Sequence, residues 1–385
     1  MIGHILYLCG PVRLLGSQIS SRRFFWDLSR YQKSLFKPCA KSSISEARAK
    51  LPWQAIRHLL SVSQVEDPKS QWKGHPVWAV DGTGARVPKS KELCQYFPAR
   101  KSKEHYPRSR VTAAVNVLTG QAGYAEVGDI YTSEPAMLSK ITPHFKPGSI
   151  VLLDRCFTGV RLWTELMNQE LFFVNRLPIF SGKNGLSQKV LRSKGNDLIL
   201  DHKGLRLRFI KGPQRKNKPR IIIVTNLLDS KKYGRKALLE LYKSRWAIET
   251  FFKQLKERLN LMDFHAKTYN GIMQEIFASL LMMSLINGMI WLAGCKSSTH
   301  KINFAAASDA IWQHMHLFLS GHHLEKNNLR ELRKLLKLIA AIQLKSRPGR
   351  CFPRISKQPE SKWIKARRAR NHVEKGHWKW SNVYR

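Results

Sequence analysis

The sequence predicts an α/β protein in which a mixed sheet is flanked by helices, with helical regions at both ends of the chain. Three observations support this prediction. Helical patterns up to about residue 66 give way near residue 76 to short runs with strand character. Three strands are then followed by helix, strand, helix and strand up to residue 177. A segment rich in Gly, Lys and Arg separates these elements from a last strand and an amphipathic helix. The 385 residues are enough for two or three domains and a sizeable core.

The first predicted region, residues 1–66, is helical and basic. Ser45 is a candidate N-cap for a short helix, and Pro52 separates this helix from a second one in WQAIRHLLSV. Two short helices joined at a break are compatible with a DNA-binding element or with a helical cap on the rest of the protein.

The central region, residues 67–270, contains the predicted sheet. Strands are expected at 77–83, 110–120, 123–131, 149–157 and 171–177, and helices at 134–141 and 158–169. The run SIVLLDRCF at 149–157 has the apolar character of a strand that is buried on both faces. Residues 179–219 are predicted to form a small β insertion that interrupts the sheet, and a last strand is expected at 220–228.

The last region, residues 271–385, is expected to be helical up to residue 343, with a mobile basic arm from Lys345 onwards. Its segment 276–294 is uncharged and nearly long enough to span a bilayer. Ser279, Ser284 and Asn287 interrupt this segment, and a charged helix precedes it. We therefore expect a buried core helix, with a membrane span as the alternative.

The charge of the chain is its most unusual bulk property. There are 67 Lys and Arg residues against 26 Asp and Glu residues, which gives a formal net charge of +41. A charge of this sign and size indicates a polyanionic partner, with nucleic acid as the first choice and an anionic membrane surface as the second. A basic surface without a specific partner is the remaining alternative.

Cysteine usage gives an expectation about the compartment. The six cysteines, at positions 9, 39, 94, 156, 295 and 351, show no CxxC spacing. The sequence therefore predicts neither a zinc site nor a disulfide framework. A reducing compartment is the simpler interpretation, and we expect a cytoplasmic protein.

One predicted helix, from Leu241 to Leu261, places a single acid within a basic stripe. At 3.6 residues per turn, one stripe of this helix carries Tyr242, Arg245, Glu249, Lys253 and Lys256. The other faces carry Trp246, Ile248, Phe251, Phe252, Leu255 and Leu259. A lone carboxylate among groups that bind phosphate or stack on a base is what a metal-dependent enzyme acting on nucleic acid needs.

Two further acids stand at the ends of predicted strands. Asp81 closes VWAVD, and Asp154 closes SIVLLD. The carboxyl ends of strands in α/β sheets are where sites form, because the backbone is held there and the side chain is partly exposed. Together with Glu249 these acids supply hard oxygen ligands that suit Mg²⁺ or Mn²⁺. Two such ions can activate a water or a 3′-hydroxyl and stabilise the leaving oxygen in phosphoryl transfer.

Each acid also has an ordinary structural interpretation. Asp81 precedes Gly82, and Asp-Gly is a common turn pair. Asp154 could pair with its neighbour Arg155, and Glu249 could pair with a basic residue four positions away on its helix. The functional interpretation is favoured because the three acids occur together in a very basic chain.

These residues resemble the bacterial transposases of the insertion sequence four family. Tyr242-x2-Arg245-x3-Glu249-x6-Lys256 matches the Tyr-Arg-Glu-Lys signature of that family. VDGTGARVP at 80–88 resembles its first aspartate segment, and VLLDRCF at 151–157 resembles its second. The resemblance spans about residues 45 to 270.

The resemblance implies a ribonuclease H-like fold with a β insertion, and a DDE transposase that cuts transposon ends and joins their 3′-hydroxyls to target DNA. It implies that Asp81, Asp154 and Glu249 bind two Mg²⁺ or Mn²⁺ ions. Phosphates of the DNA are expected to contact Tyr242, Arg245, Lys253, Lys256 and Arg155. The expected partners are double-stranded DNA, as terminal inverted repeats and as target, and a second copy of the chain in the synaptic complex, with no membrane. A bacterial, nucleoid-associated location follows from the same resemblance.

Two positions depart from the family pattern. Cys156 stands where the family usually has Gly after Asp-Arg. In members that form DNA hairpins, an aromatic residue of the insertion stacks on a flipped base, whereas residues 179–219 contain no Trp and only Phe180 and Phe209. The alternative function is therefore a catalytically impaired, DNA-binding remnant of such a transposase.

Overall fold

The computed structural model describes residues 41–99, 105–179, 185–214, 219–259, 263–294, 300–314 and 326–345, together with residues 6 and 261. The arm expected from Lys345 onwards lies outside this part of the chain except for Lys345 itself, and so does Phe180.

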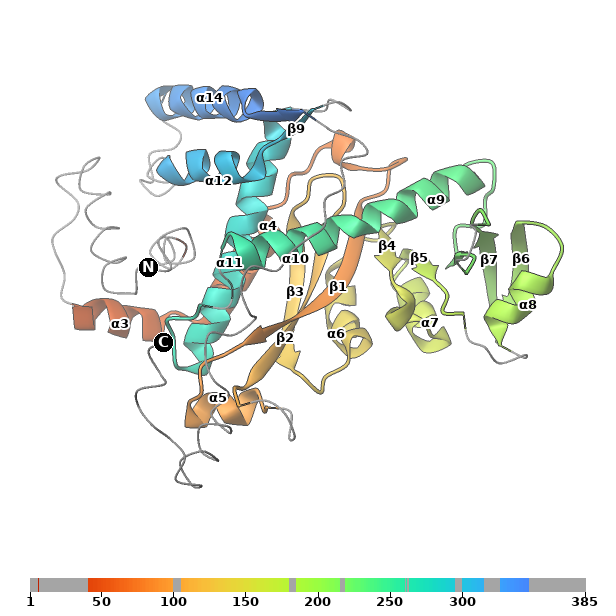
Figure 1. Ribbon diagram of the computed structural model, residues 1–385, viewed down its shortest axis with the longest axis horizontal. Coiled ribbons are helices and arrows are strands. Elements are labelled where there is room, and N and C mark those ends of the chain that lie inside the picture. Colours follow the sequence, from red (N-terminus) through yellow and green to blue (C-terminus); the bar gives the residue numbers. More distant parts are fainter. Residues whose placement is uncertain are drawn as a thin grey trace, which may run out of the picture.

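A mixed sheet of eight strands forms the centre of the described fold, in the order β3-β2-β1-β4-β5-β8-β7-β6 (Figure 1). Its strands are β1 (Val77–Arg86), β2 (Arg108–Asn116), β3 (Ala122–Asp129), β4 (Ile150–Leu153), β5 (Phe172–Arg176), β6 (Asp197–His202), β7 (Leu205–Lys211) and β8 (Ile222–Thr225). β1, β4 and β5 are parallel to one another. The pairs β1–β2, β2–β3, β5–β8, β8–β7 and β7–β6 are antiparallel. The predicted mixed sheet is confirmed.

Helices cover both faces of this sheet. The helices of the described residues are α3 (Lys41–Lys50), α4 (Trp53–Val62), α5 (Lys91–Tyr96), α6 (Glu134–Ile141), α7 (Val160–Asn168), α8 (Leu186–Arg192), α9 (Arg235–Lys243), α10 (Ala247–Glu257), α11 (Tyr269–Leu292), α12 (Phe304–Gln313) and α14 (Lys326–Ala341). Single 3₁₀ turns occur at η2 (Pro68–Ser70), η3 (Thr142–His144), η4 (Arg155–Phe157) and η5 (Ser244–Trp246). A separate pair of short strands, β9 (His300–Ile302) and β10 (Gln343–Lys345), joins the segments before α12 and after α14.

Side-chain alternation along the strands divides the core into layers. Trp78, Val80 and Val151 pack with residues of α6 and α7 on one face of the sheet. Val77 and Ile150 pack with α9 on the opposite face, where Ala79 joins the cluster around α10 and α11. Because β4 is buried on both faces, all four of its side chains are apolar.

The amphipathic helix expected at 241–261 is longer and less regular than predicted. α9, η5 and α10 follow one another and cross the sheet as one nearly continuous rod (Figure 1). The rod begins at Arg235 and ends at Glu257. Its 3₁₀ turn, at residues 244–246, contains Arg245 of the basic stripe. Trp246 was predicted to add apolar surface, but its side chain is 65% exposed.

The long apolar helix lies inside the protein. α11 is the one helix of the described residues that is long and apolar enough to cross a membrane, and 72% of its most apolar window is buried. It packs against α4, α12 and α14 and against the β3 side of the sheet. Its role as a core helix agrees with the expectation for residues 276–294.

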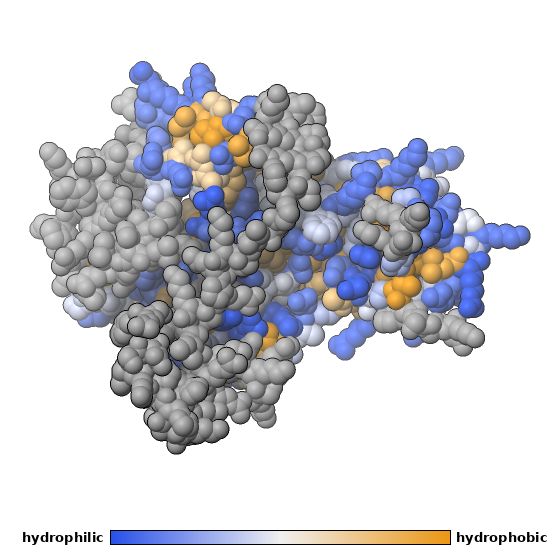
Figure 2. Space-filling model, viewed as in Figure 1, coloured by the Kyte–Doolittle hydropathy of each residue, from blue (hydrophilic) through white to orange (hydrophobic). Residues whose placement is uncertain are grey.

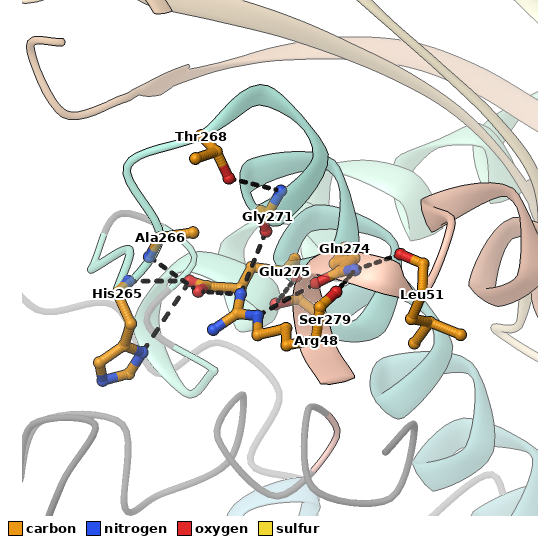
Figure 3. A network of polar contacts seen from close by, with 9 residues as sticks. All are labelled: Arg48, Leu51, His265, Ala266, Thr268, Gly271, Gln274, Glu275 and Ser279. Carbon is orange, nitrogen blue, oxygen red and sulfur yellow. Dashed lines mark hydrogen bonds and ion pairs between the residues drawn. The ribbon is translucent and has the colours of Figure 1, made fainter. Parts of the chain in front are cut away.

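A buried polar network fastens the N-terminal helices to α11 (Figure 3). The Glu275 side chain is fully buried, accepts hydrogen bonds from the backbone N–H groups of His265 and Ala266 at 3.0 Å, and pairs with Arg48 at 2.5 Å. Gln274 donates to the backbone carbonyls of Arg48 and Leu51 at 2.8 and 2.6 Å. Each of these groups is satisfied without water, so the network specifies how α3 docks on α11.

Several boundaries differ from the predictions. α3 begins at Lys41, so Ser45 lies inside the helix and is not its N-cap. The strand expected at 149–157 ends at Leu153, where the chain turns into η4. The β insertion adds β6 and β7 to the sheet beside β8, so it extends the sheet and does not interrupt it. Residues 271–343 are not helical throughout, because β9 and the start of β10 fall within them.

The surface of the described residues is mostly hydrophilic in the view of Figure 2, with an apolar patch over α12 and α14. Leu329 and Leu338 of α14 are 40% and 46% exposed. This patch lies at the far end of α11 from the network in Figure 3, on the elements that follow the sheet domain.

Replacing Glu275 by Gln is expected to destabilise the protein. The substitution leaves the Arg48 guanidinium partly buried without its counter-charge, and breaking a buried ion pair in this way costs about 3 kcal/mol. Glu331→Gln is the matched control, because Glu331 pairs with Lys334 on the exposed surface of α14. Chemical denaturation should show a lower free energy of unfolding for the first variant only, and equal values for the two variants would contradict the assigned role of the network.

Candidate active site

Parallel pairing of β1 with β4 brings two acids to the same level of the sheet. Val77 pairs with Ile150, Trp78 with Val151 and Ala79 with Leu152. Continuing this register by two residues places Asp81 level with Asp154. Alternation along both strands then directs the two carboxylates to the face covered by α9 and α10.

Asp81 lies within a strand and not at its end. β1 continues past Asp81 to Arg86 because it stays paired with β2, where Asp81 is opposite Ala113. β4 stops at Leu153, so β1 loses its other neighbour at the level of Asp81. The open side of the strand therefore begins at the aspartate. The Asp-Gly turn, which was the structural alternative for Asp81, does not form.

The Asp81 carboxyl holds its proton more tightly than an ordinary aspartate. Burial raises its pKa from 3.8 to about 6, and the nearby Glu134 and Asp154 add to the increase. The backbone N–H of Gly82, which donates to Asp81 Oδ1 at 2.8 Å, and the Arg245 guanidinium act in the opposite direction. Burial therefore outweighs the groups that stabilise the Asp81 carboxylate, and the neighbouring acids add to its effect.

Arg245 links the first acid with the third. Its Nη2 donates to Glu249 Oε1 at 2.6 Å, and its Nη1 lies 3.8 Å from Asp81 Oδ2. Burial opposes the charge on this guanidinium, but Tyr242, Glu249 and Asp81 outweigh it and raise the pKa of Arg245. Its Nε is buried and has no hydrogen-bond partner among the described residues. The ion pair between Arg245 and Glu249, which was the structural alternative for Glu249, is thus formed. The Arg245 Nε–H remains without an acceptor among the described residues.

Asp154 is held by the turn that follows β4. Its Oδ1 accepts a hydrogen bond from the Cys156 N–H at 2.6 Å, which caps η4. Asn175 of β5 is fully buried and donates to the Asp154 backbone carbonyl at 2.6 Å. The lone Asn in the apolar run LFFVNRL was the sequence pattern that could have identified this positioning residue.

Cys156 fits its turn without strain. Its side chain is exposed, and its φ is not among the positive values of the described non-glycine residues. A glycine is therefore not required there by the backbone. Burial and the neighbouring Asp154 and Glu134 raise the pKa of the thiol, so it is a neutral group beside the acids.

The remaining residues of the stripe are placed differently from one another. Tyr242 is buried, and burial raises its pKa to about 12 although Arg245 and Arg176 oppose this. Lys256 is half-buried, and burial together with the charge of Arg108 lowers its pKa. Lys253 and Arg155 are exposed. The structure thus groups Tyr242 with Arg245 and the acids, places Lys256 beside Arg108, and leaves the other two on the surface.

Glu134 is an acid that the sequence interpretation did not select. It lies in the first turn of α6 and influences the pKa of both Asp81 and Cys156. Burial raises the pKa of Glu134, Arg110 lowers it, and Asp154 raises it further. The pattern Ser-Glu after a strand, with Ser133 as N-cap, indicated only the start of a helix.

These side chains do not yet form a ligand set. No group of three or more His, Cys, Asp or Glu side chains in the described ranges is arranged to hold a metal ion. Glu249, the third acid, is paired with Arg245 instead. Phe209 of the insertion is fully buried in the sheet, where it cannot stack on a base.

A family model described as transposase DDE domain matches residues 72–285, which is more than half of the chain. The chain belongs to this transposase family. The matched residues include β1, β4 and α10, and with them the three acids. Membership identifies the protein as a DNA transposase.

Individual relatives agree with this assignment. The transposase InsG for insertion sequence element IS4 of Escherichia coli strain K12 is 21% identical over 350 residues, which cover 83% of this chain and 77% of that protein. A probable transposase for insertion sequence element IS5377 of Geobacillus stearothermophilus is 23% identical, over 65% of this chain and 67% of the relative. These matches support the insertion sequence four family suggested by the sequence. A structure of the piggyBac transposase synaptic complex with hairpin DNA covers 71% of this chain and 59% of its own, at 11% identity and a TM-score of 0.41.

Replacing Asp81 by Asn should stabilise the metal-free protein at neutral pH. Because the folded pKa of about 6 exceeds the ordinary aspartate value of 3.8, the favourable contribution of Asp81 is complete below pH 3.8 and is lost as the pH rises through 6. Asn lacks this pH dependence, so its advantage should grow between about pH 4 and pH 7 to the order of 2 kcal/mol.

Thermal unfolding in the presence of a chelator measures this effect. Asp229→Asn is a control of opposite sign, because backbone hydrogen bonds from Lys232 and Lys231 lower the pKa of Asp229. Its loss of stability should be present above pH 3.8, the ordinary pKa of an aspartate in the unfolded chain. A parallel pH dependence for the two variants would show that the pKa of Asp81 is not raised in the folded protein.

Proposed function

We propose that this transposase cuts DNA at transposon ends and joins the freed 3′-hydroxyls to target DNA, using divalent metal ions held by Asp81, Asp154 and Glu249. The observation that carries the proposal is the parallel pairing of β1 with β4. It brings Asp81 and Asp154 to the same level of the sheet, on the face covered by α10, the helix that carries Glu249. Mg²⁺ or Mn²⁺ suits this set, because carboxylate oxygens are the ligands that both prefer.

The electrostatics of the acids fit a divalent cation. Asp81 is held close enough to Asp154 and Glu134 for both to raise its pKa, and the cation found in contact with it, Arg245, is 3.8 Å away. A site that keeps acids together against their repulsion is matched by a ligand with two positive charges. When bound, such ions would polarise the scissile phosphate and lower the pKa of the attacking water or hydroxyl.

Arg245 would couple the binding of a DNA phosphate to the binding of metal ions by the three acids. Its guanidinium bonds Glu249, while its buried Nε has no partner among the described residues. A phosphate of the transposon end would offer this arginine oxygens in the geometry that guanidinium groups bind best. We infer that the phosphate binds Arg245 and thereby breaks the ion pair between Arg245 and Glu249. Glu249 is then free to bind the metal ions together with Asp81 and Asp154.

The other stripe residues would hold the DNA around this point. Tyr242 stays protonated at neutral pH, so its hydroxyl can donate to a phosphate oxygen. Lys256 and Arg108 place positive charge side by side, which is favourable once a phosphate lies between them. Lys253 and Arg155 are exposed and can reach the backbone further along the duplex.

The wider assembly follows from the same proposal. The basic region 1–66 would bind terminal inverted repeats, residues 67–270 would form the catalytic domain, and residues 271–385 would serve synapsis in a homodimer. The substrate places the protein with the bacterial nucleoid in the cytoplasm, away from any membrane.

Cleavage of labelled transposon-end DNA tests the proposed catalytic acids. Asp81→Asn, Asp154→Asn and Glu249→Gln should each reduce the cleavage rate in Mg²⁺ or Mn²⁺ by more than about 100-fold, since even outer-shell partners of a metal are worth up to that factor. Their DNA affinity should not fall, because each substitution removes a negative charge next to the DNA.

Glu165→Gln is the matched control for these variants. Glu165 is an α7 acid that accepts a hydrogen bond from Ser139 at 2.7 Å, away from the paired strand ends. It should cleave like the unmodified protein. If the unmodified protein binds transposon-end DNA but cleaves it no faster than Glu249→Gln, the chain is the impaired remnant and the enzymatic proposal fails.

Replacing Cys156 by Gly should change cleavage by less than about twofold. Its backbone conformation does not require glycine, and its thiol is exposed and neutral, so the side chain does not crowd the turn. Rates measured under single-turnover conditions decide the point. A large gain in activity for the glycine variant would show that the cysteine impairs the site.

A further inference from the structure

Arg176 stands beside the two aspartates in the row of parallel strands. β4 and β5 are parallel, and Leu153 pairs with Asn175. Continuing this register by one residue places Arg176 level with Asp154 on the neighbouring strand. Asp81, Asp154 and Arg176 therefore form one row across β1, β4 and β5. Adjacent strands lie about 4.8 Å apart, so the arginine is the next residue along the sheet from the second acid.

Alternation along β5 directs the Arg176 side chain to the face covered by α9 and α10. The preceding residue, Asn175, points to the opposite face, where its Oδ1 accepts a hydrogen bond from Trp163 Nε1 of α7 at 3.0 Å. Successive side chains of a strand point to opposite faces, so Arg176 lies on the same side of the sheet as the two aspartate carboxylates. Its backbone is held in place, because Arg176 pairs with Ile223 of β8 and its carbonyl accepts a hydrogen bond from Thr158 Oγ1 at 3.3 Å.

The Arg176 guanidinium acts on Tyr242 of the α9–α10 rod. Burial raises the pKa of the Tyr242 phenol, whereas the charges of Arg245 and Arg176 lower it and Asp154 raises it further. The hydroxyl is therefore within electrostatic reach of two guanidinium groups, one from the rod and one from the sheet. Arg176 is half-buried, and no hydrogen bond or ion pair of its side chain is found among the described residues.

We propose that Arg176 binds a phosphate of the DNA backbone beside Asp154, together with the Tyr242 hydroxyl and Arg245. This inference rests on the proposed contact of the DNA with Tyr242 and Arg245. A protonated phenol and two guanidinium groups offer a phosphate only donors and positive charge, and a planar guanidinium binds phosphate oxygens in pairs. The acids would hold the metal ions at one end of the row, and Arg176 would hold the DNA backbone at the other.

A purely structural role explains Arg176 less well. An arginine that stabilises a fold pairs with an acid or donates to carbonyl groups, as the buried Arg208 does with Asp197 and two backbone carbonyls. Arg176 has no such partner among the described residues, although burial removes part of its hydration. A ligand with negatively charged oxygens supplies the acceptors that the fold does not.

The affinity of the full chain for duplex DNA that carries the transposon end tests the proposal, measured in a chelator so that no strand is cut. Arg176→Gln should bind this DNA about tenfold more weakly, because it removes a charge-assisted contact. Arg176→Lys should recover part of the affinity, since a lysine offers the charge without the planar pair of donors. The loss of one phosphate contact should also reduce the salt dependence, lowering the slope of log affinity against log salt concentration by about one.

Neutral methylphosphonates, introduced one at a time into both DNA strands, identify the phosphate that Arg176 contacts. At one position the substitution should weaken binding by the unmodified protein about tenfold but should have little further effect on Arg176→Gln, which has already lost the contact. At the other positions both proteins should respond alike. Arg161→Gln is the matched control, because Arg161 is an exposed arginine of α7 on the opposite face of the sheet. It should bind every DNA like the unmodified protein.

Arg245→Gln separates this inference from the proposed function. If Arg245→Gln weakens DNA binding and Arg176→Gln does not, Arg176 lies outside the DNA site and the inference fails. If neither variant weakens binding, the proposed DNA site itself fails. If Arg176→Gln binds more weakly but responds to every methylphosphonate as the unmodified protein does, the arginine acts through the fold and the inference is overturned.

Discussion

The parallel pairing of β1 with β4 is the constraint on which the site depends. It sets Asp81 level with Asp154 and leaves β1 open on one side from that point onwards. Burial of the Asp81 carboxyl raises its pKa, and the negative charges of Glu134 and Asp154 add to the increase. The apolar side chains of β4, which are all buried, stabilise the pairing on both faces. Hydrophobic burial thus holds together charges that would otherwise separate.

The α9–α10 rod adds the third acid and, with it, a counter-charge. Arg245 lies in the 3₁₀ turn between the two helices, and Glu249 lies in the first turn of α10. Their contact joins the helix to Asp81 across the edge of the sheet. This arrangement is suited to a DNA-free protein, because the arginine balances the acids that a cation and a phosphate would later engage.

The ends of the described fold are connected through α11. Its buried Glu275 and Gln274 fasten α3, while its other end packs with α12 and α14. The described residues before and after the central sheet therefore share one apolar helix. This explains why so hydrophobic a segment occurs in a chain of this charge: it is a core on which several elements dock.

Most elements of the fold were predictable because their patterns are local. The helix at 134–141 was placed with its correct ends, since Ser133 caps it and Pro135 follows, whereas the strand at 149–157 was drawn too long because Asp154 caps a turn that its apolar neighbours conceal. The insertion was predicted to form β structure. Its pairing with β8 was not predicted, because the alternation of side chains along a strand does not indicate which distant strand will be its neighbour.

The same division holds for the site. The sequence alone determined the net charge, the spacing of Tyr242, Arg245, Glu249 and Lys256, and the two aspartates at apolar runs, because each is a property of neighbouring residues. Only the tertiary structure decided that Arg245 bridges two acids and that Glu134 lies against Gly82. Those contacts depend on how α6 and α10 pack on opposite faces of one sheet. Gly82 and Glu134 are 52 positions apart, and nothing in the sequence between them indicates that they come into contact.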